Sequence, residues 1–187
     1  MSFQLFKTNM LTYMMNQSGV DSTDSFANRL TTEYDLCIKK GYQSINPIPL
    51  QTGKVSAMEN LVKIACTLSL TKQEGMHTFI DDIGKGVIAY WSGASLLVGI
   101  PPVEPAIGAM LNLTTTTAVC MNPGSWTPVG PLNQTNTSSV FLDLLVASMQ
   151  SHLTTLMFQY STISQYPGVP PLIAPGVLIS SSYTVSG

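Results

Sequence analysis

Charged residues are distributed very unevenly along this chain, and this feature constrains its fold and surroundings more than any other. All eight basic residues lie at or before Lys85. From Gly86 to Gly187 only Glu104 and Asp143 are charged, so 102 consecutive residues contain no lysine or arginine. Soluble surfaces normally carry interspersed charges, which keep molecules apart. This half of the chain is therefore either kept soluble by hydroxyl and amide groups or covered by neighbouring subunits, since interface cores are depleted in charge. We favour covering by neighbours.

Composition excludes several classes of protein. Only 10% of the 187 residues are charged, 44% are hydrophobic, and the net charge is −2. This balance argues against a nucleic-acid-binding protein, which needs a basic surface, and against a polybasic membrane-surface protein. The most apolar run, Val87–Ile100, has 14 residues, whereas a spanning helix needs about 20. We expect no membrane span and no direct, sequence-specific contact with nucleic acid.

Targeting and metal-binding signals are missing from the sequence. The start, Met1–Lys7, lacks the basic region and apolar stretch of a signal peptide, so we expect no secretion by that route. Cys37, Cys66 and Cys120 are far apart and without histidine at metal spacing. We expect buried free thiols, no metal and no cofactor.

Apolar periodicity predicts a mainly α fold with about five helices. We expect them over residues 2–16, from Ser22 or Thr23 to Gly41, from a capping-box pattern at Ser56–Glu59 onward, and over about 74–97 and 138–163. Gly84 and Gly86 weaken the fourth helix, and close approach of another element would explain them.

The segments outside the predicted helices are rich in proline and glycine. Residues 99–137 form a Pro/Gly-rich irregular insert, with one short strand over Leu113–Met121, a short β-hairpin and a turn at Asn122–Ser125. We therefore expect one mainly helical domain over 1–165 and an extended C-terminal arm over 166–187. Prolines exclude a continuous helix in the arm, and its apolar residues are unusual for an inert linker. The arm either wraps its own domain or docks on a neighbour, for example by adding a strand to a sheet edge.

No residue pattern amounts to a catalytic site. Gly84–Gly86 lacks the remainder of a phosphate-binding loop, so helix packing is the better explanation. His77 and Asp81 stand four residues apart and can pair on one helix face. A dyad of His152 with Asp143 would require a convergence that the sequence does not indicate.

The order and the composition of the segments resemble those of small virion structural proteins of tailed bacteriophages. The resemblance rests on residues 78–86, Tyr90–Ala94, Pro101-Pro102, the turn at Asn122–Gly124, the helix around 142–152 and the Pro/Gly-rich arm. It implies a non-enzymatic subunit, present in many copies at the tail, neck, baseplate or capsid. Its partners would be other copies of itself and neighbouring virion proteins, within a particle assembled in the host cytoplasm.

Candidate interface residues are large apolar or aromatic side chains in or near the charge-poor half. They are Tyr90, Trp91, Trp126, Tyr166, Val169, Leu172, Ile173, Val177, Ile179 and Tyr183. Two alternatives remain open. One is a receptor- or glycan-binding module of the virion that uses Trp126 and Tyr166. The other is a small hydrolase that uses His77, Asp81 or His152.

Overall fold

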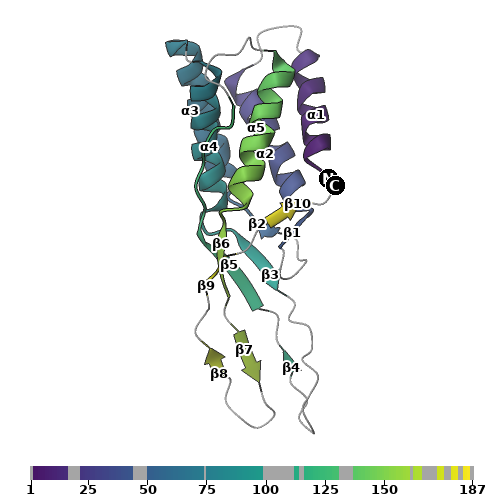
Figure 1. The fold of residues 1–187 in the computed structure, drawn as a ribbon, viewed down its shortest axis with the longest axis vertical. Coiled ribbons are helices and arrows are strands. Elements are labelled where there is room, and N and C mark those ends of the chain that lie inside the picture. The colour runs from purple at the N-terminus through teal and green to yellow at the C-terminus, as the bar shows by residue number, and fades with distance from the viewer. Residues whose placement is uncertain are drawn as a thin grey trace.

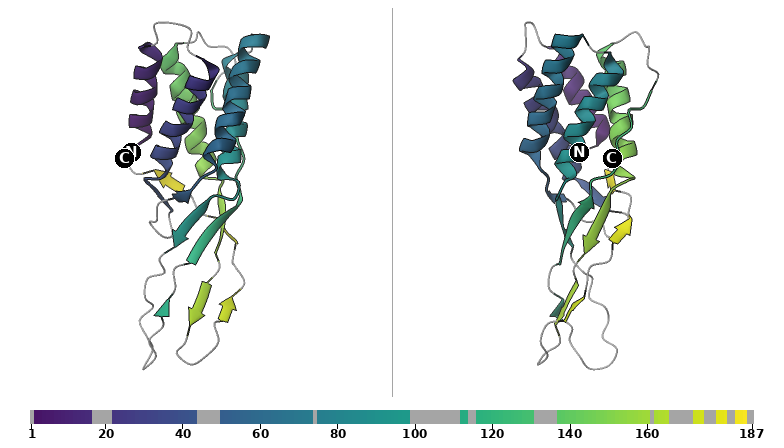
Figure 2. Two further views of the ribbon diagram at one scale, coloured as in Figure 1. Left: turned by 180° about the vertical axis from the view of Figure 1, so that it is seen from behind. Right: turned by 90° about the vertical axis from the view of Figure 1, so that its left-hand side faces the viewer.

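The fold is mainly helical, with five helices at one end of the molecule and short strands extending from the other end (Figures 1 and 2). It comes from a computed structural model. The model describes residues 2–16, 22–43, 50–73, 75–98, 112–113, 116–130, 137–160, 162–165, 172–174, 178–180 and 183–185.

The five helices confirm the predicted number and most of the predicted positions. They are α1 (Phe3–Met15), α2 (Thr23–Ile38), α3 (Val55–Lys72), α4 (Met76–Trp91) and α5 (Ser138–Leu153). Ser22 caps α2, because its hydroxyl accepts a hydrogen bond from the Ser25 amide at 3.1 Å. The predicted capping box at Ser56 is wrong. α3 begins at Val55 after Lys54, and no side chain caps it.

Ten short strands among the described residues form three antiparallel sheets. A five-stranded sheet lies against the helices in the order β2 (Leu50–Thr52), β3 (Ser95–Val98), β5 (Thr116–Asn122), β6 (Met157–Tyr160) and β9 (Leu178–Ser180). Farther from the helices, β7 (Thr162–Gln165) lies between β4 (Asn112–Leu113) and β8 (Leu172–Ala174). The third sheet pairs β1 (Gly41–Gln43) with β10 (Tyr183–Val185). The single strand predicted over 113–121 overlaps β5, but Leu113 belongs to β4, which lies in a different sheet.

Two helices end earlier than their apolar periodicity predicted. α4 stops at Trp91 because Gly93 takes a left-handed conformation, with φ +73°, and the chain turns into β3. α5 stops at Leu153, and Met157–Tyr160 then pairs with β5 and β9 as strand β6. In both places strand pairing overrides a helical pattern that continues in the sequence.

Three described strands of the C-terminal segment pair with earlier strands of the same chain. β8 pairs with β7, β9 with β6, and β10 with β1. These strands contain the candidate interface residues Leu172, Ile173, Ile179 and Tyr183. Tyr166, Val169 and Val177 lie outside the described residues.

A buried aromatic network joins the helices to the five-stranded sheet. The rings of Tyr34 and Tyr90 pack edge to face, with 5.1 Å between their centroids. The rings of Trp91 and Phe158, which belongs to β6, also pack edge to face, with 6.2 Å between their centroids. The Trp91 indole donates to the Tyr34 hydroxyl at 2.8 Å, and the Tyr90 hydroxyl donates to Asp35 at 2.8 Å. This arrangement corrects the prediction that Tyr90 and Trp91 are interface residues. Both are 0% exposed, because their polar atoms find partners inside the core.

α4 runs without a break through Gly84 and Gly86, and close packing accounts for both glycines. A Cβ atom added at Gly86 would lie 3.1 Å from the Met58 carbonyl oxygen of α3. A Cβ atom at Gly84 would lie 2.2 Å from the Trp126 indole. The expectation that another element approaches α4 at these positions is therefore confirmed.

Candidate functional site

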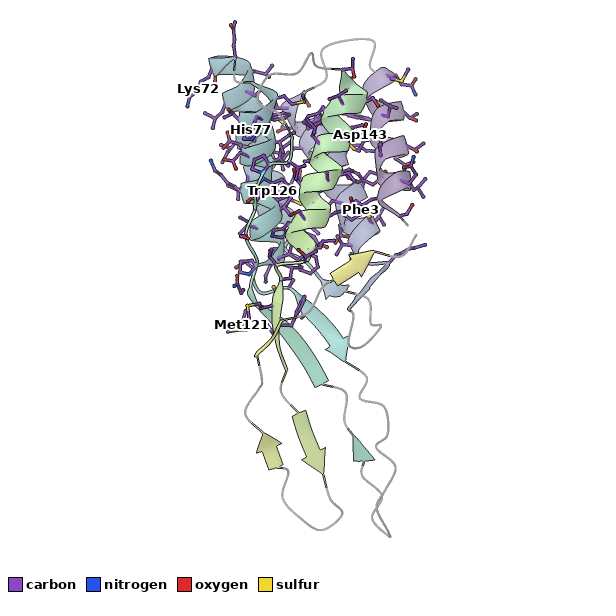
Figure 3. All side chains as sticks on the ribbon, in the orientation of Figure 1. Phe3, Lys72, His77, Met121, Trp126 and Asp143 are labelled. Carbon is purple, nitrogen blue, oxygen red and sulfur yellow. The ribbon has the colours of Figure 1, made fainter. Side chains whose placement is uncertain are left out.

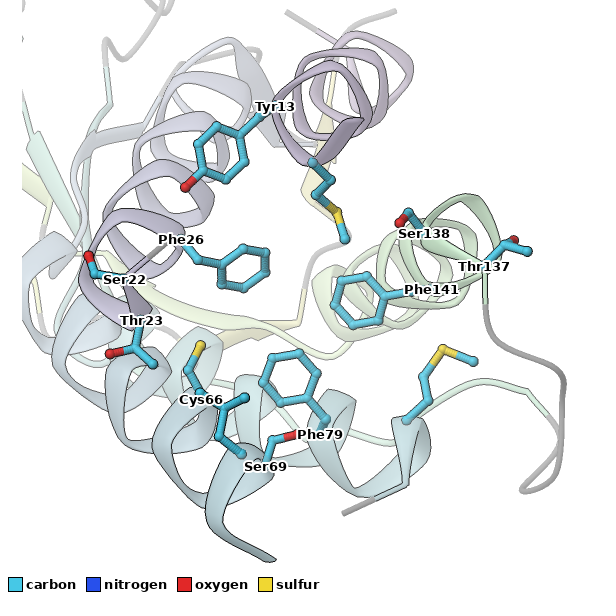
Figure 4. Close-up of a pocket in the computed structure, with 13 residues that line it drawn as sticks. Tyr13, Ser22, Thr23, Phe26, Cys66, Ser69, Phe79, Thr137, Ser138 and Phe141 are labelled. Atoms are coloured by element: carbon cyan, nitrogen blue, oxygen red, sulfur yellow. The ribbon is translucent and has the colours of Figure 1, made fainter. Parts of the chain in front are cut away.

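An apolar pocket of about 540 Å³ lies at the end of the helical bundle that faces away from the strands; it is called the end pocket below. All five helices contribute to it (Figure 4). Its lining residues are Tyr13, Met14, Ser22, Thr23, Phe26, Cys66, Ser69, Leu70, Met76, Phe79, Thr137, Ser138 and Phe141.

Three phenylalanine rings from three helices face the interior of the end pocket. The ring of Phe79 on α4 stacks on the ring of Phe141 on α5, with 5.6 Å between the centroids. The centroid of the Phe26 ring on α2 lies 6.3 Å from that of Phe79. None of the thirteen lining residues is charged. A pocket of this size and lining suits neutral apolar groups and has no side chain that would pair with an ion.

Two hydroxyl groups at the end pocket cap helices. The hydroxyls of Ser22 and Thr137 accept hydrogen bonds from the first turns of α2 and α5. Cys66 is buried, and its burial raises the pKa of the thiol to about 11. The thiol is therefore protonated near neutral pH and is a poor nucleophile.

Two large apolar side chains are exposed at this same end of the bundle. Leu70, in the last turns of α3, is 72% exposed, and Met15, the last residue of α1, is 74% exposed. Leu70 also lines the end pocket, and Met15 follows the lining residue Met14. Both side chains therefore lie at the end of the bundle that holds the end pocket.

A second feature is an extended segment, residues 123–130, that lies along α4 and α5; it is called the strap below. The Ser125 amide donates to the Thr155 hydroxyl at 2.9 Å, and the Val129 amide donates to the Ser148 hydroxyl at 2.8 Å. Trp126 of the strap packs on Gly84. Trp126 is thus held against its own chain, although it was predicted as an interface residue and as a sugar-binding candidate.

His152 anchors the start of the strap. Its Nε2 atom lies 2.6 Å from the Pro123 carbonyl oxygen and therefore donates to it. Burial lowers the pKa of His152 to about 4, so the ring is neutral at pH 7. The His152 Nδ1 and Trp126 Nε1 atoms are buried without a hydrogen-bond partner among the described residues.

The remaining candidate residues do not converge on one site. Asp143 forms an ion pair with Lys7 of α1 at 2.5 Å. It stands nine positions before His152 on α5, which puts the two side chains on opposite faces, about 13 Å apart along the axis. His77 and Asp81 lie on α4 (His77 is labelled in Figure 3), and no ion pair joins them among the described residues. The structure therefore does not assemble a dyad of His152 with Asp143.

The cysteines follow their prediction, since Cys37, Cys66 and Cys120 are free and buried. Burial raises the pKa of Cys37 and of Cys120 to about 12. Within the described part of the chain, no three His, Cys, Asp or Glu side chains gather as a metal site. None of the described helices combines the length and hydropathy that crossing a membrane requires.

Comparison with known proteins identifies no relative: no protein-family model, curated protein or solved structure matches the chain.

Sequence reasoning missed the end pocket and the strap. Phe26, Phe79 and Phe141 lie within three of the predicted helices, but nothing in the sequence indicated that they meet at one end of a bundle. Gly84 did carry a signal, because any side chain at this position would block a close neighbour. The sequence did not identify that neighbour as Trp126.

Proposed function

We propose that this protein is a non-enzymatic structural subunit of a bacteriophage particle, which packs in multiple copies against neighbouring virion proteins. The observation that carries the proposal is that charged residues are present at one end of the molecule and absent from the described strands at the other. Among the described residues, the charged side chains belong to the helical end, and the strands are uncharged.

Every charged residue in the described part of the chain lies in a helix or within two residues of one. Several form ion pairs along one helix, such as Arg29 with Glu33 at 2.7 Å and Lys63 with Glu59 at 3.1 Å. None of the ten described strands contains a charged residue. Such a separation supports solvation of the helices and covering of the strands in an assembly.

The edges of the five-stranded sheet support the same interpretation. Natural proteins usually protect sheet edges with charged residues or proline. The edge strands β2, Leu50–Thr52, and β9, Leu178–Ser180, contain neither. Met121 of β5 is 56% exposed, which adds a large apolar side chain below the helices (Figure 3). Burying such surface stabilises an assembly by about 25 cal/mol per Å² before association costs.

The phage particle, as opposed to another large assembly, is proposed from the resemblance of residues 75–187 to virion structural proteins. That resemblance also suggests that the protein resides in the virion after assembly in the host cytoplasm. In this proposal the C-terminal strands contact neighbours while they remain paired within their own chain.

A charge placed at the strand end tests the proposal. Met121→Lys adds one positive charge to an exposed strand position, and Asn60→Lys adds the same charge to an exposed position on α3. We expect Met121→Lys to reduce the mass measured by light scattering towards that of the 20.1 kDa chain. We expect Asn60→Lys to leave the mass unchanged. Equal masses for both variants, with helical circular dichroism retained, would count against the strand end as a contact surface.

A further inference from the structure

We propose that the strap is a pH-dependent conformational switch. When His152 is protonated, residues 123–130 detach from α4 and α5, while the five helices stay folded. The switch operates within one chain and does not require copies to associate, so it holds or fails independently of the proposed function.

Three side chains at and just beyond the C-terminal end of α5 hold the backbone of the strap. They are Ser148, His152 and Thr155, which stand four and three residues apart and therefore lie on one face. Their hydrogen bonds to the strap are 2.6–2.9 Å long. The hydroxyl groups of Ser148 and Thr155 do not titrate near neutral pH. Of these three anchors, His152 is thus the one whose hydrogen bonding changes with pH.

Within the described part of the chain, the imidazole of His152 has a hydrogen-bond partner on one nitrogen only. Nε2 donates its proton to the Pro123 carbonyl oxygen, so Nδ1 of the neutral ring carries no proton. Nδ1 is buried without a partner, and the residue is 1% exposed. Protonation therefore adds a donor and a positive charge at an atom that has no acceptor. Detachment of the strap lets water reach this atom, so the charged ring favours the detached state.

The strap, α1 and β5 bring no anion to the protonated ring among the described residues. The strap has no titratable residue. α1 packs on the opposite face of α5, where its Lys7 pairs with Asp143. β5 contributes Cys120, and burial raises the pKa of this thiol to about 12, so the thiol stays neutral.

α4 carries further titratable groups, and none of them offsets a charge on His152. They are His77, Asp81, Asp82, Lys85 and Tyr90. The first turns of α4 and α5 both line the end pocket, so the two helices begin at the same end of the bundle. The first two of these residues therefore lie towards that end, whereas His152 is in the last turn of α5. Asp82 pairs with Lys85, and Tyr90 donates to Asp35.

The strap can detach by itself because its ends can act as hinges and its contacts are few. Gly124 and Gly130 have φ angles of +81° and +117°, and glycine absorbs changes of backbone angle readily. Three of the five residues between them are exposed. Segments with few buried contacts open at a lower free energy than the core. Leu145 and Met149 of α5 belong to the buried core of the bundle, so the helix stays packed when the strap leaves.

The direction and the size of the pH dependence follow from the pKa of His152 in the two states. Burial lowers this pKa to about 4 in the attached state, and contact with water restores it to about 6.5 in the detached state. The detached state therefore binds the proton first, so attachment is strongest above pH 6.5 and weakens as the pH falls towards 4. The ratio of attached to detached strap should fall about 100-fold between pH 7 and pH 4.

Hydrogen exchange of the full-length chain between pH 7 and pH 4 tests the switch, because exchange detects openings that are rarely populated. Peptides covering residues 123–130 report on the strap, and peptides covering residues 141–149 report on the core of α5. We expect the strap to be less protected than the core at every pH. We also expect protection of the strap, corrected for the intrinsic exchange rate, to fall about 100-fold from pH 7 to pH 4.

Two results would overturn the inference. Equal protection of the two sets of peptides would mean that the strap detaches only when the whole protein unfolds. Protection of the strap that does not change with pH would mean that His152 does not control its attachment.

Two variants separate the titration of His152 from the loss of an anchor. His152→Gln keeps an N–H donor for the Pro123 carbonyl but does not titrate, so protection of its strap should no longer change with pH. Thr155→Val is the matched control, because it removes an anchor that does not titrate. Its strap should be less protected at every pH and should keep the dependence on pH.

Circular dichroism verifies that the helices of each variant are intact. A folded His152→Gln variant that keeps the pH dependence, or a folded Thr155→Val variant that loses it, would contradict the role of His152. The wild-type and Thr155→Val measurements decide the question even where His152→Gln does not fold.

Discussion

The helical end and the strand end of this molecule differ in how their polar groups are satisfied. In the helical end, Glu33 is only 4% exposed and is bound by Arg29 and Asn9, while Asp35 is bound by Tyr90 and Lys39. The described strands have no charged group to satisfy. The helical end is thus specified by contacts within the chain. The strand end has a neutral surface whose partners, in our proposal, are other molecules.

The largest effect on this comparison is expected from Trp91→Ala. Trp91 is 0% exposed, contacts Phe158 of β6 and donates to Tyr34 of α2. Its loss should lower the free energy of unfolding by about 3–5 kcal/mol, because it leaves a cavity and removes a buried hydrogen bond. Chemical denaturation measures this change. Ser56→Ala, at an exposed position of α3, is the control and should have little effect. A Trp91→Ala variant as stable as wild type would show that the two ends are not joined through this residue.

Acid should weaken the attachment of the strap. The pKa of His152 is about 4 in the folded protein, below the value of about 6.5 expected for an unfolded chain. The unfolded state therefore binds the proton first. The stability from the neutral ring is present above pH 6.5 and is lost as the pH falls towards 4, by up to about 3 kcal/mol.

Unfolding by urea between pH 7 and pH 4 measures this dependence. His152→Gln should remove the loss of stability that protonation of His152 causes, so the stability of this variant should fall less steeply between pH 7 and pH 4 than that of wild type. An identical slope for wild type and His152→Gln would be inconsistent with a buried neutral His152.

Gly84→Ala should have a smaller but specific effect. The added Cβ atom would lie 2.2 Å from the Trp126 indole, so the strap must shift. Overpacking of this kind costs about 1–3 kcal/mol. The matched test is Gly84→Ala in a Trp126→Ala background, where the added methyl meets no indole and should cost much less. If denaturation shows that Gly84→Ala lowers the free energy of unfolding equally in both backgrounds, contact between the two residues is excluded.

The smallest effect is expected from Thr137→Ala. The Thr137 hydroxyl accepts from the Val140 amide at 3.3 Å and caps α5 at the rim of the end pocket. Its loss should cost about 1 kcal/mol and should leave the oligomer mass unchanged. Thr67→Ala, at an exposed position in the middle of α3, is the control. A large change in mass with Thr137→Ala would indicate that this hydroxyl takes part in association.

The helical end could be predicted from the sequence to a large extent. Apolar spacing and the Ser22 cap located α1 and α2 to within a residue or two, because local signals specify helices. Gly84 and Gly86 correctly indicated close packing on α4. The early ends of α4 and α5 were not predicted, since Leu96–Val98 and Met157–Tyr160 fit a helical pattern as well as a strand. Their pairing partners are distant in the sequence.

The candidate site could be predicted much less well. Tyr90 and Trp91 looked like interface residues because they are aromatic and lie at the start of the charge-poor half. Their burial depends on Tyr34 and Asp35, more than fifty residues earlier. The end pocket likewise depends on how five helix ends meet. Such contacts between distant segments leave no local pattern that could be recognised.

The solution mass of the full-length wild-type chain tests the central claim most directly. Light scattering after size exclusion measures it without any variant. The account predicts a defined oligomer whose mass is a whole multiple of 20.1 kDa. A soluble 20.1 kDa monomer at every concentration would contradict it, because the neutral strands would then be soluble without a partner.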